Sequence, residues 1–214
     1  GGAWHPVAAV RTGYIQSLDT TGLLAFASQR RTVVRMERRV GQFVIEGETL
    51  AAVLDVAPSE DDRLRLRGLY AVGRQRTVEQ DAAFGVRQIV DVALKALSPG
   101  VNDTTTAVMC IDHLTAILAR LSERRIESSH RSQDGELRLL TRGPTYADLV
   151  SEAFDQIREN AGGNVAVLAG LLGALELLGG RTRSPRRRAV LLEHARAVAE
   201  LGERSLSAPR DRRR

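Results

Sequence analysis

The fold of this chain is decided by a stretch that reads RTVEQDAAFGVRQIVDVALKALSPGVNDTTTA, residues 76–107. Thr77 and Gln80 lie three residues apart, which is the spacing of a capping box, so a helix should begin near them. Arg87 and Asp91, four residues apart, can form an ion pair on one side of this helix. An apolar stripe at helical spacing is predicted on the opposite side, formed by Phe84, Ile89, Val92, Ala93 and Ala96.

A polar turn separates this helix from a second one. Ser98, Pro99 and Gly100 end the first helix, and either Asn102 or Asp103 caps the next. Apolar residues continue at helical spacing from there as far as residue 121. The stretch therefore predicts a helical hairpin.

More helices are predicted toward the carboxyl terminus. Thr145 begins one, Asn164 caps a strongly apolar one that continues to Leu178, and a last helix covers about residues 187–206. Between these and the helical hairpin, residues 126–141 contain Asp134-Gly135 flanked by two short segments, which predicts a β-hairpin. We expect residues 58–206 to form a helical domain with this one β-hairpin.

The first 57 residues have a composition typical of short strands. Residues 7–18 and 32–38 are strand-like, with a helical pattern over residues 20–30, and Val34 and Met36 should share one face. Ser59, followed by three acids, then caps the first helix of the helical domain.

Residues 40–55, VGQFVIEGETLAAVLD, contain two glycines suited to positive φ or tight turns. The segment resembles half of a biotinyl/lipoyl-type barrel-sandwich module, which has a hammerhead-like fold. The resemblance rests on Gly41, Val44, Gly47 and Leu50. Carrier versions of that module attach their cofactor to a lysine, and residues 1–94 contain none. We therefore expect the shape without the carrier function, and no cofactor.

The net charge of +5 comes from two arginine-rich segments. Outside them the chain has 22 basic and 25 acidic residues, because only Asp211 lies among these arginines. With 4% aromatic residues and no binding motif, we expect no nucleic-acid partner. The predicted tail, residues 207–214, should be basic and disordered. The nine arginines are Arg181, Arg183, Arg186, Arg187, Arg188, Arg210, Arg212, Arg213 and Arg214.

No segment is long enough to cross a bilayer. The longest apolar run, residues 165–178, contains Glu176 and falls short of the roughly 20 residues that a span needs. We therefore expect a water-soluble part of a protein, and any membrane anchor must lie outside this sequence.

Four segments together resemble the soluble region of the bacterial membrane proteins called domain of unknown function 2254. They are residues 13–19, 41–50, 76–107 and 152–161, and the third is long enough to be specific. The resemblance implies transmembrane helices before this region and implies no established activity. The chain departs from the family in lacking those helices and in having Thr104 where members often have proline.

The best candidate site is the polar cluster of the helical hairpin. A helix start offers backbone N–H groups for an anion, and several carboxylates could collect a cation. The alternatives are that these side chains cap helices and pair with each other, or that they form a subunit contact. The candidates for ligand binding or an interface are Arg76, Glu79, Asp81, Arg87, Gln88, Asp91, Asn102, Asp103 and Thr104.

Catalytic and metal sites have weaker support. There is no Gly-x-Ser-x-Gly motif, and Cys110 and His113 share a helical face without further zinc ligands. His113 is expected to be half-buried. We assign neither a catalytic residue nor a metal ligand.

These features predict an α+β, mainly helical fold: a small barrel-sandwich or hammerhead-like β module (1–57), then a helical bundle with one β-hairpin. The predicted function is that of a regulatory or assembly domain of a bacterial membrane protein, a channel or a transporter. It would form homo-oligomers, contact its own transmembrane region and respond to a small ligand or ion. The alternative is an enzyme of unknown reaction that uses residues 76–105. Arg-rich segments and the single cysteine favour the cytoplasmic side of the inner membrane.

Overall fold

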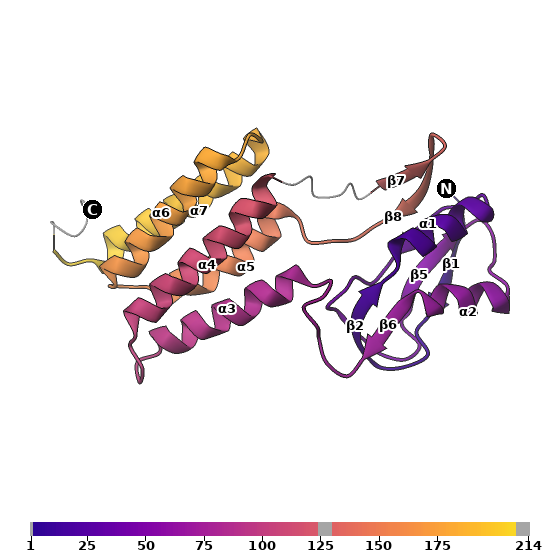
Figure 1. The fold of residues 1–214 in the computed structure, drawn as a ribbon, viewed down its shortest axis with the longest axis horizontal. Coiled ribbons are helices and arrows are strands. Elements are labelled where there is room, and N and C mark those ends of the chain that lie inside the picture. Colours follow the sequence, from indigo (N-terminus) through magenta and orange to yellow (C-terminus); the bar gives the residue numbers. More distant parts are fainter. Residues whose placement is uncertain (1, 124–129, 209–214) are drawn as a thin grey trace. The chain divides into compact units, whose positions relative to one another are not determined.

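The computed structural model describes residues 2–123 and 130–208. The predicted α+β class is confirmed: 53% of these residues are helical, and they also form a five-stranded mixed sheet and a three-stranded antiparallel sheet (Figure 1). The chain divides into two compact units, Gly1–Phe84 with Glu127–Gly143, and Gly85–Ile126 with Pro144–Arg214. The domain division after residue 57 stays a prediction, and most of the predicted tail, residues 209–214, lies outside the described residues.

The first unit contains both sheets. The five-stranded sheet has the order β1-β5-β3-β8-β7, and the three-stranded sheet has the order β4-β2-β6. All neighbours are antiparallel except β3 and β8, which are parallel. The elements are β1 (Trp4–Ala8), β2 (Gly13–Leu18), α1 (Thr20–Gln29), β3 (Val34–Met36), β4 (Phe43–Val44), β5 (Thr49–Leu54), α2 (Glu60–Gly68), β6 (Tyr70–Gly73), β7 (His130–Gln133) and β8 (Glu136–Leu140).

The predicted barrel-sandwich is wrong, because neither sheet closes into a barrel. The short strands are divided between two sheets, and each sheet keeps two edges. Local predictions inside the module hold nevertheless. Gly41 and Gly47 have φ values of +85° and +89°. Val34 and Met36 are both buried.

The core of the first unit lies between α1 and the strands. Helix α1 contributes Leu23, Phe26 and Ala27, all at most 1% exposed, and β2 contributes the fully buried Ile15. The hairpin β7–β8 belongs to this core through Leu139, which is fully buried and pairs with Val34 of β3. The predicted β-hairpin is therefore confirmed, but it completes a sheet of the first unit instead of accompanying the helices.

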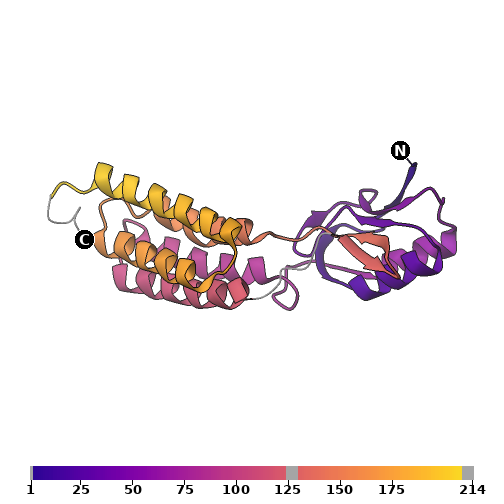
Figure 2. The same ribbon diagram turned by 90° about the horizontal axis from the view of Figure 1, so that it is seen from above.

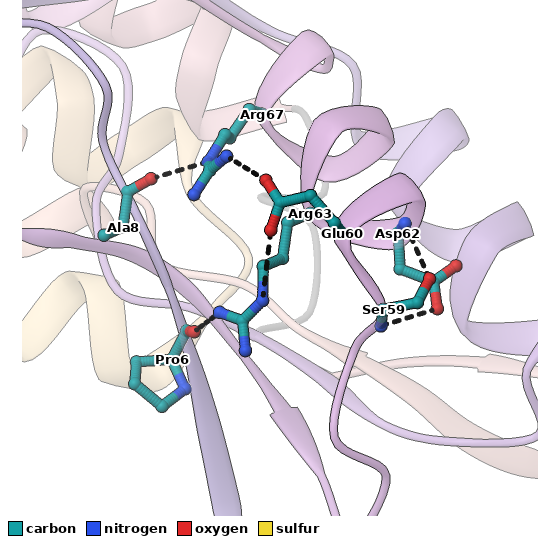
Figure 3. A network of polar contacts seen from close by, with 7 residues as sticks. All are labelled: Pro6, Ala8, Ser59, Glu60, Asp62, Arg63 and Arg67. Carbon is teal, nitrogen blue, oxygen red and sulfur yellow. Dashed lines mark hydrogen bonds and ion pairs between the residues drawn. The ribbon is translucent and has the colours of Figure 1, made fainter.

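Helix α2 covers an edge of the five-stranded sheet (Figure 3). Ser59 and Asp62 form a capping box at its start, which confirms Ser59 as the cap. Arg63 Nη1 donates to the carbonyl oxygen of Pro6 at 2.9 Å, and Arg67 Nε donates to that of Ala8 at 3.0 Å. Because β1 is an edge strand, these two arginines satisfy backbone carbonyls that no neighbouring strand reaches.

The second unit is built from helices. Helix α6 contacts both α4 and α7, and α5 contacts α4, α6 and α7 (Figures 1 and 2). Asn164 caps α6 as predicted, whereas the last helix begins at Pro185, two residues earlier than predicted, with Ser184 as its cap. The helices are α3 (Ala82–Leu97), α4 (Thr104–Glu123), α5 (Tyr146–Glu159), α6 (Val165–Arg181) and α7 (Pro185–Ser205).

The buried face of α3 differs from the predicted stripe. Its buried residues are Val86, Val90, Ala93 and Ala96, whereas Val92 is 51% exposed. The spacing of apolar residues allowed either face, because both sides of this helix carry aliphatic side chains. His113 on α4 is exposed, not half-buried as predicted.

Candidate functional site

The predicted site begins in the loop before α3, where Arg76 and Asp81 form an ion pair. Arg76 Nε and Nη2 donate to Asp81 Oδ2 at 3.0 and 2.7 Å. Asp81 Oδ1 accepts from the backbone N–H of Phe84 at 3.0 Å, and the Arg76 guanidinium lies 4.6 Å from the centre of the Phe84 ring. Both oxygens of this 5%-exposed carboxylate thus have partners, and Asp81, not Thr77, caps α3.

The same loop is fastened to strand β2. Gln80 Oε1 accepts from the N–H of Leu18 at 3.0 Å, and Gln16 Nε2 donates to the carbonyl of Gln75 at 2.8 Å. Thr77 Oγ1 also donates to the carbonyl of Gln16, at 3.5 Å. The predicted capping box is therefore wrong: both of its side chains bind a strand that is distant in sequence. Glu79, between them, is exposed.

Arg87 connects α3 with α5. It forms the predicted ion pair with Asp91 and lies 3.6 Å from a carboxylate oxygen of Glu152. The hydrogen bond to Asp91 raises the pKa of Arg87 further, so its charge is constant at any physiological pH. Gln88, the next residue, is exposed.

The turn between α3 and α4 is closed by Asp103. Its carboxylate accepts from the backbone N–H of Thr106 at 3.0 Å and from the Thr106 hydroxyl, and these bonds lower the pKa of Asp103. Asp103 is thus the cap, while Asn102 adopts the left-handed conformation, with φ +48°. Thr104 Oγ1 accepts from Asn164 Nδ2 at 2.8 Å, which joins the starts of α4 and α6.

The structure therefore distributes the nine candidate residues over three separate sets instead of one cluster. One set, with the Arg76–Asp81 pair, lies in the loop before α3, one lies on α3 where Arg87 reaches α5, and one lies in the turn that begins α4. About 11 residues of helix separate Arg87 from the turn, which corresponds to roughly 16 Å. Among the residues that the structure describes, no group of three or more His, Cys, Asp or Glu could hold a metal ion.

A polar set that the sequence analysis missed joins α5 and α7. Ser151 Oγ lies 3.4 Å from His194 Nε2, and His194 Nδ1 lies 3.3 Å from Asp155 Oδ1. This is the order of groups in a Ser-His-Asp triad. However, Ser151 lies inside α5, where backbone N–H groups are bonded within the helix and cannot stabilise an oxyanion. The set is better explained as a polar contact between two helices. Only the four-residue spacing of Ser151 and Asp155 could have pointed to it.

The comparisons with known proteins give the chain a family but no activity. The family model described as Predicted membrane protein (DUF2254) matches residues 1–177. The chain belongs to the DUF2254 family. Among the residues that the structure describes, no helix combines the length and apolar character that crossing a membrane requires.

Relatives of this DUF2254 chain are longer. Uncharacterised proteins of Mycobacterium tuberculosis and Mycobacterium bovis are 30% identical to it over 213 residues, covering 97% of this chain. The chain spans only 41% of the length of these relatives. No solved structure matches it.

Proposed function

We propose that this DUF2254 chain is the regulatory and assembly part of a bacterial membrane protein, and that it self-associates through its helical unit. The relatives' additional length leaves room for a membrane-spanning region, its first partner. A channel or a transporter is the type of protein that we infer.

The observation that carries the assembly proposal is the exposure of three aliphatic side chains on α3, on α4 and in the turn between them. Val92, Val101 and Met109 are 51%, 54% and 53% exposed. Isolated exposed aliphatic residues are ordinary, but here three lie within 18 residues of one helical hairpin. Burying them against a second copy would remove apolar area from water, which is the main driving force of association.

Light scattering at micromolar concentration tests this proposal. We expect a mass above the 23.3 kDa of one chain, and a shift toward that value in the double variant Val92→Gln, Met109→Gln. Leu64→Gln is the matched control, since Leu64 is 59% exposed but lies on α2 in the first unit. A wild-type protein that is strictly monomeric, or an equal effect of the control, would contradict the proposal.

Ligand or ion sensing is the second part of the proposal. The Arg87 guanidinium pairs with the carboxylates of Asp91 and Glu152. A bound anion would compete with these two carboxylates for the guanidinium. A bound cation would compete with the guanidinium for the two carboxylates. A thermal-shift series with phosphate, Mg²⁺ and Ca²⁺ tests both. A rise in Tm that Arg87→Gln removes supports anion binding, and one that Asp91→Asn removes supports cation binding. No rise with any of these ions would speak against sensing at this position.

The enzyme alternative is not what the geometry favours. An acid–base mechanism needs carboxylates that converge on one pocket. Asp91 pairs with Arg87, while Asp103 binds Thr106 within its own helix turn. We therefore keep the assembly function as the conclusion.

We further infer that this part of the protein faces the cytoplasm at the inner membrane. Arginine-rich segments near spans favour that side, and Cys110 has no disulfide partner. In the longer protein, green fluorescent protein joined directly after residue 214 should fluoresce, and alkaline phosphatase joined at the same position should be inactive. The opposite pair of results would place this part outside.

A further inference from the structure

The connection between α6 and α7 is the most basic part of the described chain. Residues 177–192 contain five arginines and no aspartate or glutamate. One of the five, Arg187, is used inside the helical unit: its Nη1 donates to the carbonyl of Ser122 at 2.7 Å, and its guanidinium lies 5.0 Å from the Tyr146 ring centre. The other four are exposed and are called the basic corner below: Arg181, Arg183, Arg186 and Arg188.

Few acidic groups offset the charge of the basic corner. Among the described residues, Arg181 has one acidic neighbour, Glu123 at 3.5 Å, and both side chains of this pair are more than half exposed, so water screens it strongly. Arg188 donates to the carbonyl of Thr182 at 3.1 Å, which leaves its charge uncompensated. For Arg183 and Arg186, no ion pair is found within the described part of the chain.

Two exposed leucines adjoin the basic corner. Leu177 is 46% exposed and lies four residues before Arg181, and Leu192 is 51% exposed and lies four residues after Arg188. Residues four apart share a helix face, so each leucine neighbours an arginine of the corner. Cationic side chains next to exposed aliphatic ones are typical of proteins that bind membrane surfaces: the arginines contact anionic headgroups and the aliphatic groups enter the interface.

We propose that the basic corner is a docking surface for anionic phospholipid headgroups. A nucleic acid fits it less well, because no Phe, Trp or Tyr follows Phe154 in the sequence and the Tyr146 ring beside Arg187 is buried, so bases would lack an exposed ring to stack on. This inference goes beyond the assembly function, and it does not require the chain to self-associate.

Cosedimentation of the whole chain with vesicles tests the proposal. We expect binding to phosphatidylcholine vesicles that contain phosphatidylglycerol, weak binding to phosphatidylcholine alone, and a loss of binding as salt is raised. The double variant Arg183→Gln, Arg186→Gln should bind about 25-fold more weakly, since each arginine near an anionic surface contributes about a fivefold factor. The charge-matched control is Arg11→Gln, Arg74→Gln, two exposed arginines of the first unit, and it should bind nearly as the wild type does.

Two further arms separate the corner from other sources of binding. Deleting residues 207–214 removes the terminal arginines. In the shortened chain, Arg183→Gln, Arg186→Gln should still weaken vesicle binding by the same factor as in the whole chain. Leu177→Ser, Leu192→Ser should weaken binding that remains at high salt. Circular dichroism verifies that each variant is folded. If the double variant Arg183→Gln, Arg186→Gln does not fold, vesicle binding is measured with Arg183→Gln alone. The proposal is overturned if tail deletion alone abolishes binding, if the control matches the corner variant, or if duplex DNA binds as tightly as the vesicles at equal salt.

Discussion

Gly41 and Gly47 have nearly the same φ angle, +85° and +89°, but different surroundings. A Cβ on Gly41 would lie 2.0 Å from Asp81 Oδ2, whereas a Cβ on Gly47 would meet nothing within 4 Å. Gly47→Ala should therefore cost only the left-handed backbone strain, about 1 kcal/mol. Gly41→Ala should cost at least about 2–3 kcal/mol, because the buried Asp81 must leave Arg76 as well.

Urea unfolding of the two variants measures this difference. The Gly47 variant is the control for strain alone. Equal losses of stability in the two variants would show that the Arg76–Asp81 pair does not hold the loop before α3.

Tyr70 and Tyr146 are both 4% exposed but differ in their hydroxyl groups. Tyr70 donates to the carbonyl of Leu50 at 3.2 Å, whereas the Tyr146 hydroxyl has no hydrogen-bond partner within the described chain. Burial raises the pKa of both. Tyr146→Phe should leave stability unchanged or raise it by up to about 1 kcal/mol, and Tyr70→Phe should lower it by about 1 kcal/mol. Thermal unfolding gives both values, and the same sign for the two variants would contradict this account.

Among the elements, α1 and α2 are joined by Asp62. Burial would raise the pKa of Asp62, but hydrogen bonds from Arg30 and Ser59 outweigh it and lower the pKa below its usual value. The folded state therefore gains stability above the unfolded pKa of about 3.9 and loses it as pH falls through the lower folded pKa. Asp62→Asn should lower stability by about 1–2 kcal/mol at neutral pH, and the gap should close in acid.

Tm measured from pH 7 down to the acid transition tests this linkage. Asp61→Asn is the matched control, since Asp61 is an exposed residue in the same helix turn. A gap between wild type and Asp62→Asn that stays constant with pH would rule out the proposed role of the charge.

Elements with local signals were predictable from the sequence, and elements with distant partners were not. Asp134-Gly135 marked the β-hairpin, because both residues adopt positive φ, +54° and +79°. Tyr70, by contrast, begins β6, which pairs with β2 about fifty residues earlier in the sequence. Periodicity carries no information on such pairing.

The candidate site shows the same limit. The Arg87–Asp91 pair follows from helical spacing and was predicted. The bond between Thr104 and Asn164 joins residues 60 apart, and the bond from the Leu18 N–H to Gln80 joins residues 62 apart. The sequence identified polar residues that matter for the local fold, but not the separate partners that divide them into three sets.

At the scale of the whole molecule, the two units are not consecutive in sequence. The chain leaves the first unit after Phe84, in the first turn of α3, completes α3 and makes α4 in the second, returns for β7 and β8, and then supplies α5 to α7. Composition changes near residue 57 could not reveal this order, because the hairpin segment is too short to change the average composition around it.

This interleaving affects how the protein is made on the ribosome. Strand β3 receives one neighbour, β5, early, but its other neighbour, β8, is translated only after α3 and α4. During that interval the nascent first unit has an open strand edge, of the kind that attracts other chains. The order of synthesis thus differs from the order of assembly, and a chaperone present during translation would protect β3 until β8 emerges.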